Sequence, residues 1–189
     1  IRFFNVIRNM QNQKNKFFFK EHYNGYKNLI SACLHSLRKR KFLKKKYLYK
    51  NFDISSLIHE EISNYNDYNT INIGFLNYKF FENLNKNRIQ VTKTINWFEN
   101  QIIDKGWNFG FRKFNKLFNN NSFGYQDFSR HFNLISNSPS ILEAKSKVTP
   151  ETIIIITNLF KKITQEFFIK QKILLGCSWR FKNIEKIKL

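Results

Sequence analysis

The residues whose types and spacing most directly indicate chemistry in this sequence are cations. The segment from residue 38 to residue 50 has eight basic residues and no acidic residue. Guanidinium groups bind phosphate oxygens in a bidentate manner and ammonium groups act as point charges, so this segment is typical of a site that binds RNA or another polyanion. The basic residues are Arg38, Lys39, Arg40, Lys41, Lys44, Lys45, Lys46 and Lys50.

Three aromatic residues, Phe42, Tyr47 and Tyr49, lie among these cations. Aromatic side chains stack on unpaired bases in many proteins that bind single-stranded RNA. They also pack against neighbouring helices in ordinary cores. The sequence leaves both roles open for these three side chains.

The sequence lacks the residue patterns of the common catalytic and metal sites. It has no glycine-rich phosphate loop, no GxSxG segment and no second histidine at HExxH spacing from His59. Its acidic residues are scattered, and we expect Cys33 and Cys177 to be inert. We therefore predict no enzymatic activity, no cofactor, no metal and no small-molecule substrate. The histidines lie in four separate segments, at His22, His35, His59 and His131.

The overall composition agrees with a polyanionic partner. Lys and Arg number 33 against 13 Asp and Glu, which gives a formal charge of +20 and a pI near 10.0. Repulsion among so many like charges opposes a compact fold unless a polyanion neutralises them. The chain has 22 Phe but alanine only at Ala32 and Ala144, a bias typical of an A/T-rich genome such as that of an organelle. We therefore expect a protein of the mitochondrial matrix, with another organelle as the alternative.

Elements must position these side chains, and the spacing of apolar residues predicts a mainly α fold. Residues 1–25 show no clear period and are expected to form an extended arm. Residues 26–50 are predicted to form one long basic helix that binds RNA. Residues 51–117 are predicted to form a small helical globule, with helices over 52–63, 77–86 and 92–104.

The predicted globule has a single small core. Asn77 is a suitable N-cap for the second of its helices, and Gly74 and Gly106 are expected to lie just outside helix ends. The apolar residues of the helices then fall on one face. The expected core consists of Phe80, Leu84, Ile89, Ile95, Phe98 and Ile102, with Phe52, Leu57 and Ile58 packed against it.

Residues 118–189 are predicted to form a C-terminal helical extension with its main helix near 150–175. Thr149 and Pro150 have the residue types of an N-cap and a first helical position. Apolar residues then recur every three or four positions until Gly176, where we expect the helix to end. The longest run of apolar residues is too short to cross a bilayer, so no transmembrane segment is predicted.

Two stretches of the sequence match a known pattern. Residues 32–40 read Ala-Cys-Leu-His-Ser-Leu-Arg-Lys-Arg, which places Arg38 and Arg40 in phase with Ala-Leu-x-Tyr-Ala-Tyr-Arg-Asp-Arg. From Gly74 to Lys93 the chain follows Gly-Leu-x-Tyr-x-x-Phe and its continuation without a gap, although Tyr78 is out of phase by one. In these stretches the chain resembles the family of bacterial-type large-subunit ribosomal protein number twenty. The resemblance spans residues 28–115.

This resemblance implies a largely α-helical structural constituent of the large subunit of an organellar ribosome, without catalysis. Its partners would be large-subunit rRNA and neighbouring ribosomal proteins. The rRNA-binding set would comprise the cations of 38–50 together with Lys27, Lys86 and Lys93. Two alternatives stay open. The first is another organellar RNA-binding protein, such as a different ribosomal protein or a splicing factor, and the second is a basic membrane-apposed subunit of a respiratory complex.

Overall fold

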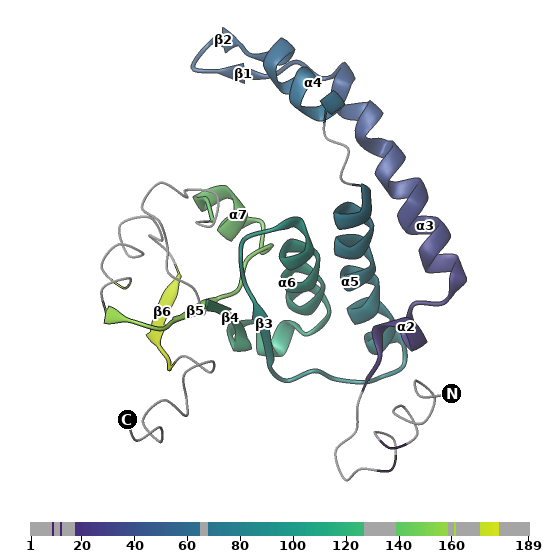
Figure 1. Ribbon diagram of the computed structural model, residues 1–189, viewed down its shortest axis with the longest axis vertical. Helices are drawn as coiled ribbons and strands as arrows, with labels where there is room; N and C mark the ends of the chain where they lie inside the picture. Colours follow the sequence, from purple (N-terminus) through teal and green to yellow (C-terminus); the bar gives the residue numbers. More distant parts are fainter. Residues whose placement is uncertain are drawn as a thin grey trace, which may run out of the picture.

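The structure, a computed structural model, has a mixed α/β architecture (Figure 1). It describes residues 18–64, 68–126, 139–158 and 171–177, and the isolated positions 9, 12 and 161. In Figure 1 a parallel sheet, helix α6, helix α5 and helix α3 follow one another across the molecule. The prediction of a mainly α fold is therefore wrong, because four strands of the second half of the chain pair side by side.

The first large feature is a projection that we call the basic arm, residues 26–64. It starts as a helix beside α5 and ends in a hairpin and a short helix at the far end of the molecule from the sheet (Figure 1). A short helix, α2 (Lys20–Tyr23), precedes it. The elements of the basic arm are α3 (Tyr26–Ser36), the 3₁₀ helix η1 (Leu37–Lys44), β1 (Leu48–Tyr49), β2 (Phe52–Asp53) and α4 (Ser55–Asn64).

The prediction of one long basic α-helix over residues 26–50 is wrong. The α-helix ends at Ser36, and the cations continue in a 3₁₀ helix and a hairpin. Like charges three and four residues apart destabilise an α-helix, which agrees with its end at the start of the basic run. Tyr49 pairs with Phe52 across a two-residue loop whose φ angles, 45° at Lys50 and 71° at Asn51, are both positive, as in a type I′ turn.

Two helices form the centre of the molecule, α5 (Tyr68–Lys86) and α6 (Ile102–Phe114). Gly74 and Gly106 lie inside these helices rather than outside their ends, so their predicted role as breaks is wrong. Asn77 is a buried residue inside α5, and its Nδ2 donates to the carbonyl of Ile103 at 3.1 Å. Asn77 is therefore not an N-cap, and its side chain instead joins the two helices by a hydrogen bond.

All strands of the main sheet are parallel and adjacent in chain order. The register places Trp97 beside Tyr125, Tyr125 beside Ile154, and Ile154 beside Leu174. Helix α6 and the 3₁₀ helix η2 (Lys116–Asn121) connect the first two strands, and α7 (Ile141–Lys145) precedes the third. The strands are β3 (Thr94–Trp97), β4 (Ser122–Gln126), β5 (Thr152–Ile155) and β6 (Lys172–Leu175).

Strands occupy parts of two predicted helices, and most of residues 159–170 of the second lie outside the described residues. The helix expected over 92–104 is replaced by β3 and the start of α6, and the helix expected near 150–175 is replaced by β5 and β6 at its two ends. The Ile run from 153 onward is β-branched and favours extended backbone when both faces are covered. Arg112 of α6 anchors the start of β5 through an ion pair with Glu151 at 2.7 Å and a bond to the Thr149 carbonyl at 3.2 Å.

Among the described residues the apolar interior has two clusters. Between α5 and α6 lie Phe80, Phe81, Leu84 and Phe111, with Ile89 packed against them. The second cluster belongs to the sheet and comprises Phe98, which follows β3, with Ile153 and Ile155 of β5. The predicted core is therefore right for Phe80, Leu84 and Ile89. The prediction is wrong for Phe98, which belongs to the sheet cluster. It is also wrong for Ile95, Phe52 and Leu57, whose exposed fractions are 49%, 74% and 60%.

Candidate functional site

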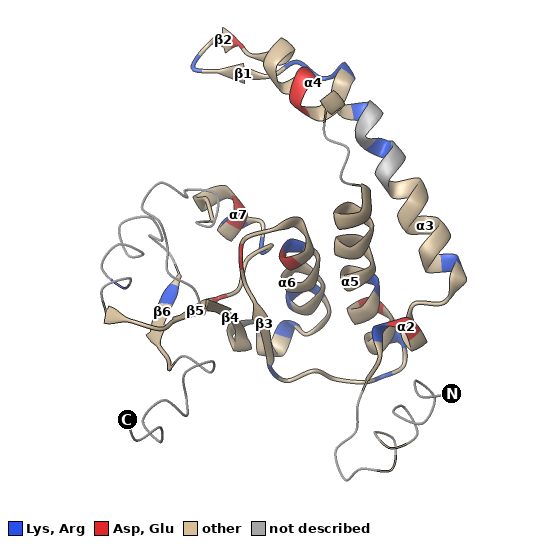
Figure 2. Cartoon of the chain, in the orientation of Figure 1, with Lys and Arg blue, Asp and Glu red and all other residues tan. Residues whose placement is uncertain are grey.

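The predicted RNA-binding residues do not form one cluster; Figure 2 shows Lys and Arg in blue on several elements. Most of them follow one another along η1 and the hairpin of the basic arm, where the side chains of Arg38, Lys41, Lys44, Lys45, Lys46 and Lys50 are exposed. Lys39 and Arg40 belong to η1, and their side chains lie outside the described part of the structure.

The three remaining cations lie elsewhere. Lys27 is an exposed residue near the start of α3. Lys86 ends α5 and pairs with Glu82 at 3.7 Å, and Lys93 precedes β3 with its Nζ 5.8 Å from the centre of the Phe123 ring. The end of α5 lies beside α2, at the opposite end of α5 from the hairpin (Figure 1). The structure therefore does not gather Lys86 and Lys93 with the cations of the basic arm.

The aromatic residues of the basic arm divide between the two roles that the sequence leaves open. Tyr47 packs edge-on against His59 and donates a hydrogen bond to the Phe42 carbonyl at 3.0 Å, so its role is structural. Phe42 and Tyr49 are exposed, with a lysine Nζ 5.1 Å and 5.5 Å from their ring centres. These two rings stay accessible to a partner.

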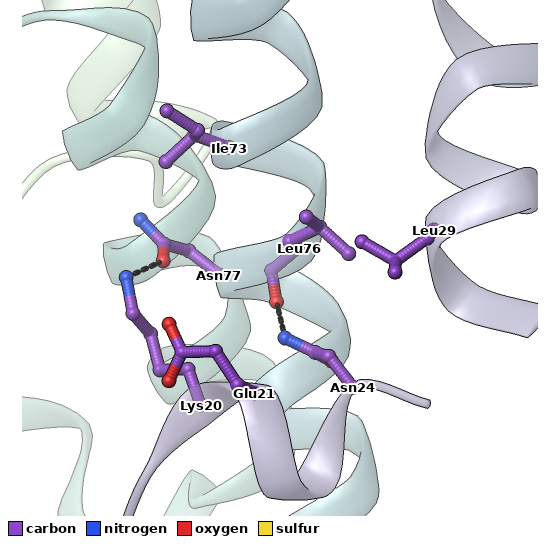
Figure 3. A pocket seen from close by; sticks show the side chains of 7 residues that line it. All are labelled: Lys20, Glu21, Asn24, Leu29, Ile73, Leu76 and Asn77. Atoms are coloured by element: carbon purple, nitrogen blue, oxygen red, sulfur yellow. Dashed lines mark hydrogen bonds between the residues drawn. The ribbon is translucent and has the colours of Figure 1, made fainter. Parts of the chain in front are cut away.

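A small pocket of about 200 Å³ lies between α2, α3 and α5 (Figure 3). Two of its polar side chains bond to α5: Lys20 Nζ donates to Asn77 Oδ1 at 2.9 Å, and Asn24 Nδ2 donates to the Leu76 carbonyl at 2.9 Å. These bonds hold α2 on α5. We therefore interpret the pocket as a gap between packed helices, in which Lys20 and Asn24 stabilise the contact of α2 with α5.

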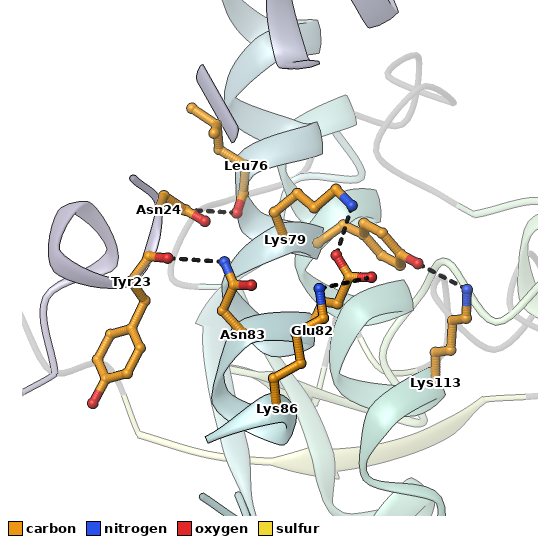
Figure 4. A network of polar contacts seen from close by, with 9 residues as sticks. Tyr23, Asn24, Leu76, Lys79, Glu82, Asn83, Lys86 and Lys113 are labelled. Atoms are coloured by element: carbon orange, nitrogen blue, oxygen red, sulfur yellow. Dashed lines mark hydrogen bonds and ion pairs between the residues drawn. The ribbon is translucent and has the colours of Figure 1, made fainter. Parts of the chain in front are cut away.

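A polar network on the neighbouring face of α5 is also structural (Figure 4). The Glu82 carboxylate forms ion pairs with Lys79 Nζ at 2.6 Å and with Lys86 Nζ at 3.7 Å. Asn83 Nδ2 donates to the Tyr23 carbonyl at 2.8 Å. Burial opposes ionisation of Glu82, but the hydrogen bond from Lys79 and the charges of its lysine neighbours outweigh burial and lower its pKa. The network keeps Glu82 ionised and fixes the outer surface of α5.

An apolar pocket of about 330 Å³ lies between α3, α5 and α6. Stacked rings line its wall. The ring centres of His35 and Phe75 are 4.5 Å apart, and those of Tyr78 and Phe109 are 5.6 Å apart. Burial, and secondarily the charge of Arg38, lowers the pKa of His35 and favours the neutral ring that stacks there. Lys113 donates to the Tyr78 hydroxyl at 2.8 Å and closes one side of the ring series.

The last candidate site is the carboxyl edge of the parallel sheet. We use this name for Gln126, which ends β4, and for the residues that follow the other strands, 98–101, 156–158 and 176–177. In open parallel sheets the carboxyl ends of the strands are where ligands bind, because the loops there are free to vary above a rigid frame. The best-built part of this edge is the loop that follows β3.

Asp104 organises the loop after β3. It is the third residue of α6, and its Oδ2 accepts the backbone N–H of Glu99 at 2.9 Å and of Gln101 at 3.1 Å. Its Oδ1 accepts Nδ2 of Asn96 at 3.3 Å. Burial raises the pKa of Asp104, and these hydrogen bonds oppose the rise in part. A buried carboxylate thus fixes the backbone around Asn100, which has a left-handed φ of 60°.

This arrangement presents a second carboxylate, that of Glu99, at the partly exposed end of β3. Glu99 Oε1 accepts the indole N–H of Trp97 at 2.7 Å, and Oε2 accepts Nε2 of Gln101 at 2.8 Å. Trp97 packs edge-on against Tyr125 of the next strand, whose hydroxyl donates to the Cys177 carbonyl at 2.7 Å. Side chains of β3 and β4 therefore meet the backbone that follows β6 at this edge.

Sequence reasoning missed this site because it placed residues 92–104 in one helix. A signal was present in the sequence. Thr94 to Trp97 is rich in β-branched and aromatic residues, and Gln101 with Asp104 has the spacing of a capping box at a helix start. Among the described residues no group of three or more His, Cys, Asp or Glu side chains is arranged to hold a metal ion. No helix in the described ranges is long and apolar enough to cross a bilayer.

Comparisons of the chain with protein-family models, with curated proteins and with solved structures found no match. The ribosomal family that the sequence resembles is largely helical, and the parallel sheet contradicts that implication. The matched run from Gly74 to Lys93 begins inside α5 and ends in the loop before β3. The ribosomal role, the rRNA partner and the location in the mitochondrial matrix stay predictions.

Proposed function

We propose that the α/β part of this protein binds a small polar ligand at the carboxyl edge of its sheet. The observation that carries this proposal is the fixed carboxylate of Glu99, held by Trp97 on one oxygen and by Gln101 on the other. A site that binds a ligand specifically needs polar groups that are positioned before the ligand arrives. The loop bonded to Asp104 supplies such positioning.

The chemistry of the edge indicates which ligand groups would bind. An ionised carboxylate has about four acceptor positions, so Glu99 can accept further hydrogen bonds beyond the two it receives. Its natural complement is a ligand with hydroxyl or amino donors. The exposed ring of Trp97 lies next to this carboxylate and offers an apolar surface for the carbon frame of the same ligand.

The indole N–H groups make a direct test by NMR. Trp97 reports on the carboxyl edge, while Trp107 donates to Thr94 Oγ1 at 2.7 Å, at the amino end of the same strand, and serves as an internal control. The full chain is titrated with a panel of nucleotides, polyols and amines. We expect at least one class to shift the Trp97 signal while leaving that of Trp107 in place.

A pair of variants makes this test specific. Glu99→Gln removes the carboxylate charge at nearly constant shape and should weaken the binding of that ligand. Glu60→Gln makes the same change on the exposed face of α4, in the basic arm, and should leave binding unchanged. A panel that never shifts the Trp97 signal, or a shift that is as large in Glu99→Gln as in the unchanged protein, would refute the proposal.

A further inference from the structure

The basic arm exposes large apolar side chains at its far end and along α3. A soluble surface tolerates scattered apolar residues, but those of the arm follow one another over consecutive elements. In the hairpin, both residues of β1 and both of β2 are exposed, so neither face of this small ribbon is packed on the described part of the chain. The main members are Ile30, Leu34, Leu48, Tyr49, Phe52 and Leu57, each at least 57% exposed.

The same segment concentrates positive charge. Residues 26–64 have nine Lys and Arg against three acids. Lys44, Lys45 and Lys46 lead into the hairpin, and Lys50 lies in its turn. The ion pair between Lys46 and Asp53 is long, at 3.6 Å, and exposed, so it neutralises little of this charge. Exposed apolar side chains therefore occupy the same projection of the molecule as the cations, which are blue in Figure 2.

We propose that the basic arm docks on the surface of an anionic lipid bilayer. Leu48, Tyr49 and Phe52 enter the headgroup region, where burial removes their apolar surface from water. The lysines that flank the hairpin contact the anionic headgroups, which attract basic segments within about a Debye length of the surface. The arm lies on the membrane and does not span it.

Two other occupants fit the surface less well. Single-stranded RNA can stack its bases on the exposed rings of Phe42, Tyr49 and Phe52. It leaves the equally exposed leucines without an apolar partner, namely Leu34, Leu48 and Leu57. A second copy of the chain would bring two strongly basic arms together, and their like charges would repel. An anionic bilayer complements both properties of the arm, because it has a negative surface and an apolar interior.

Vesicle flotation with the full chain tests this proposal. Vesicles of phosphatidylcholine alone are compared with vesicles of phosphatidylcholine and phosphatidylglycerol. We expect binding to the anionic vesicles and little to the neutral ones. The double variant Leu48→Ser and Phe52→Ser should lower the partition coefficient roughly tenfold or more, since each residue contributes apolar burial. Replacing Lys44, Lys45 and Lys50 by Gln should lower it by a similar factor.

Matched controls separate docking from a general effect of the substitutions. Leu117→Ser removes a leucine that is 86% exposed on η2, outside the arm, and should leave vesicle binding unchanged. Lys145→Gln and Lys147→Gln do the same for exposed cations near α7. Circular dichroism confirms that each variant keeps its secondary structure.

Two outcomes would overturn the proposal. In the first, the unchanged protein does not float with anionic vesicles, or the hairpin variant floats equally well. In the second, an unstructured RNA oligonucleotide binds the chain, the lysine variant loses that binding, and the Leu48 and Phe52 variant keeps it. The second outcome would assign the arm to nucleic acid, in agreement with the RNA-binding role predicted from the sequence.

Discussion

Gly74 of α5 and Gly106 of α6 face each other at the closest approach of the two helices. A Cβ added to Gly106 would overlap the carbonyl oxygen of Gly74, and one added to Gly74 would lie 2.8 Å from the Ile102 carbonyl oxygen. Both obstacles are backbone atoms, which cannot move aside without separating the helices. The contact sets the distance between α5 and α6, and therefore the distance of α5 from the sheet, because α6 lies between them.

The first prediction concerns this contact. Gly106→Ala should destabilise the protein by about 3 kcal/mol or more, at or above the upper end of ordinary overpacking, because the clash is with backbone. Urea unfolding followed by circular dichroism measures the change. Gly25→Ala is the matched control, since a Cβ there meets nothing within 4 Å. Equal stability of the two variants would mean that α5 and α6 do not cross at these glycines.

The second prediction concerns the core between the same helices. Leu84 is 3% exposed and packs with Phe80, Phe81 and Phe111. Leu84→Ala should lower the free energy of unfolding by about 2–5 kcal/mol, as truncation of a buried leucine does. Asn85→Ala, at an exposed neighbouring position, should change it by less than about 0.5 kcal/mol. Similar values for the two variants would contradict the register of α5.

The third prediction concerns Asp104, which fixes the loop of the carboxyl edge. Asp104→Ala leaves the backbone N–H groups of Glu99 and Gln101 without their acceptor and should cost about 1–3 kcal/mol. Asp104→Asn should cost less, because its amide oxygen can still accept both N–H groups and only the bond from Nδ2 of Asn96 is lost. Thermal unfolding ranks the two variants, and the opposite order would refute this account of the loop.

The fourth prediction uses the pH dependence of stability. Because the pKa of Glu82 is lowered in the folded protein, its contribution is present above the ordinary value of 4.5 and is lost as pH falls through the lowered pKa. For Asp104 the sign is opposite. Its raised pKa means that the folded state holds a proton more tightly, so its contribution falls as pH rises from 3.8 through the raised pKa.

Urea unfolding over a series of acidic pH values separates these two contributions. Glu82→Gln should flatten the loss of stability at the acidic end. Asp104→Asn should make the rise of stability with pH steeper above 3.8, because it removes the opposing contribution. If Glu82→Gln leaves the acidic slope unchanged, the lysine network of Figure 4 does not hold this carboxylate ionised in solution.

Several features could be predicted from the sequence because neighbouring residues determine them. The cations of residues 38–50 had to lie on a surface, since a run of like charges cannot be buried, and the described ones are exposed. The helical face of Phe80 and Leu84 follows from their spacing by four and is buried as predicted. The end of α3 at Ser36 and the turn at Lys50 and Asn51 were not predicted, since residues 26–50 were expected to form one helix.

Only the tertiary structure decided the roles of the glycines and of the isoleucine run. A glycine is equally compatible with a helix end and with a close contact between helices, and the position of a second helix selects between them. The segment from Ile153 has apolar residues at helical spacing and also a β-branched run. It becomes a strand because β4 lies beside it, more than twenty residues earlier in the chain.

The candidate site follows the same division. Glu99, Gln101 and Asp104 are ordinary polar residues in the sequence, and nothing in their spacing joins them to Tyr125 or Cys177. They become one edge because parallel strands must be connected by crossovers, which bring the ends of distant segments together on the same side of a sheet. The sequence by itself determined where charge and apolar surface lie along the chain. Strand pairing between distant segments, which no local pattern specifies, determined which polar groups meet.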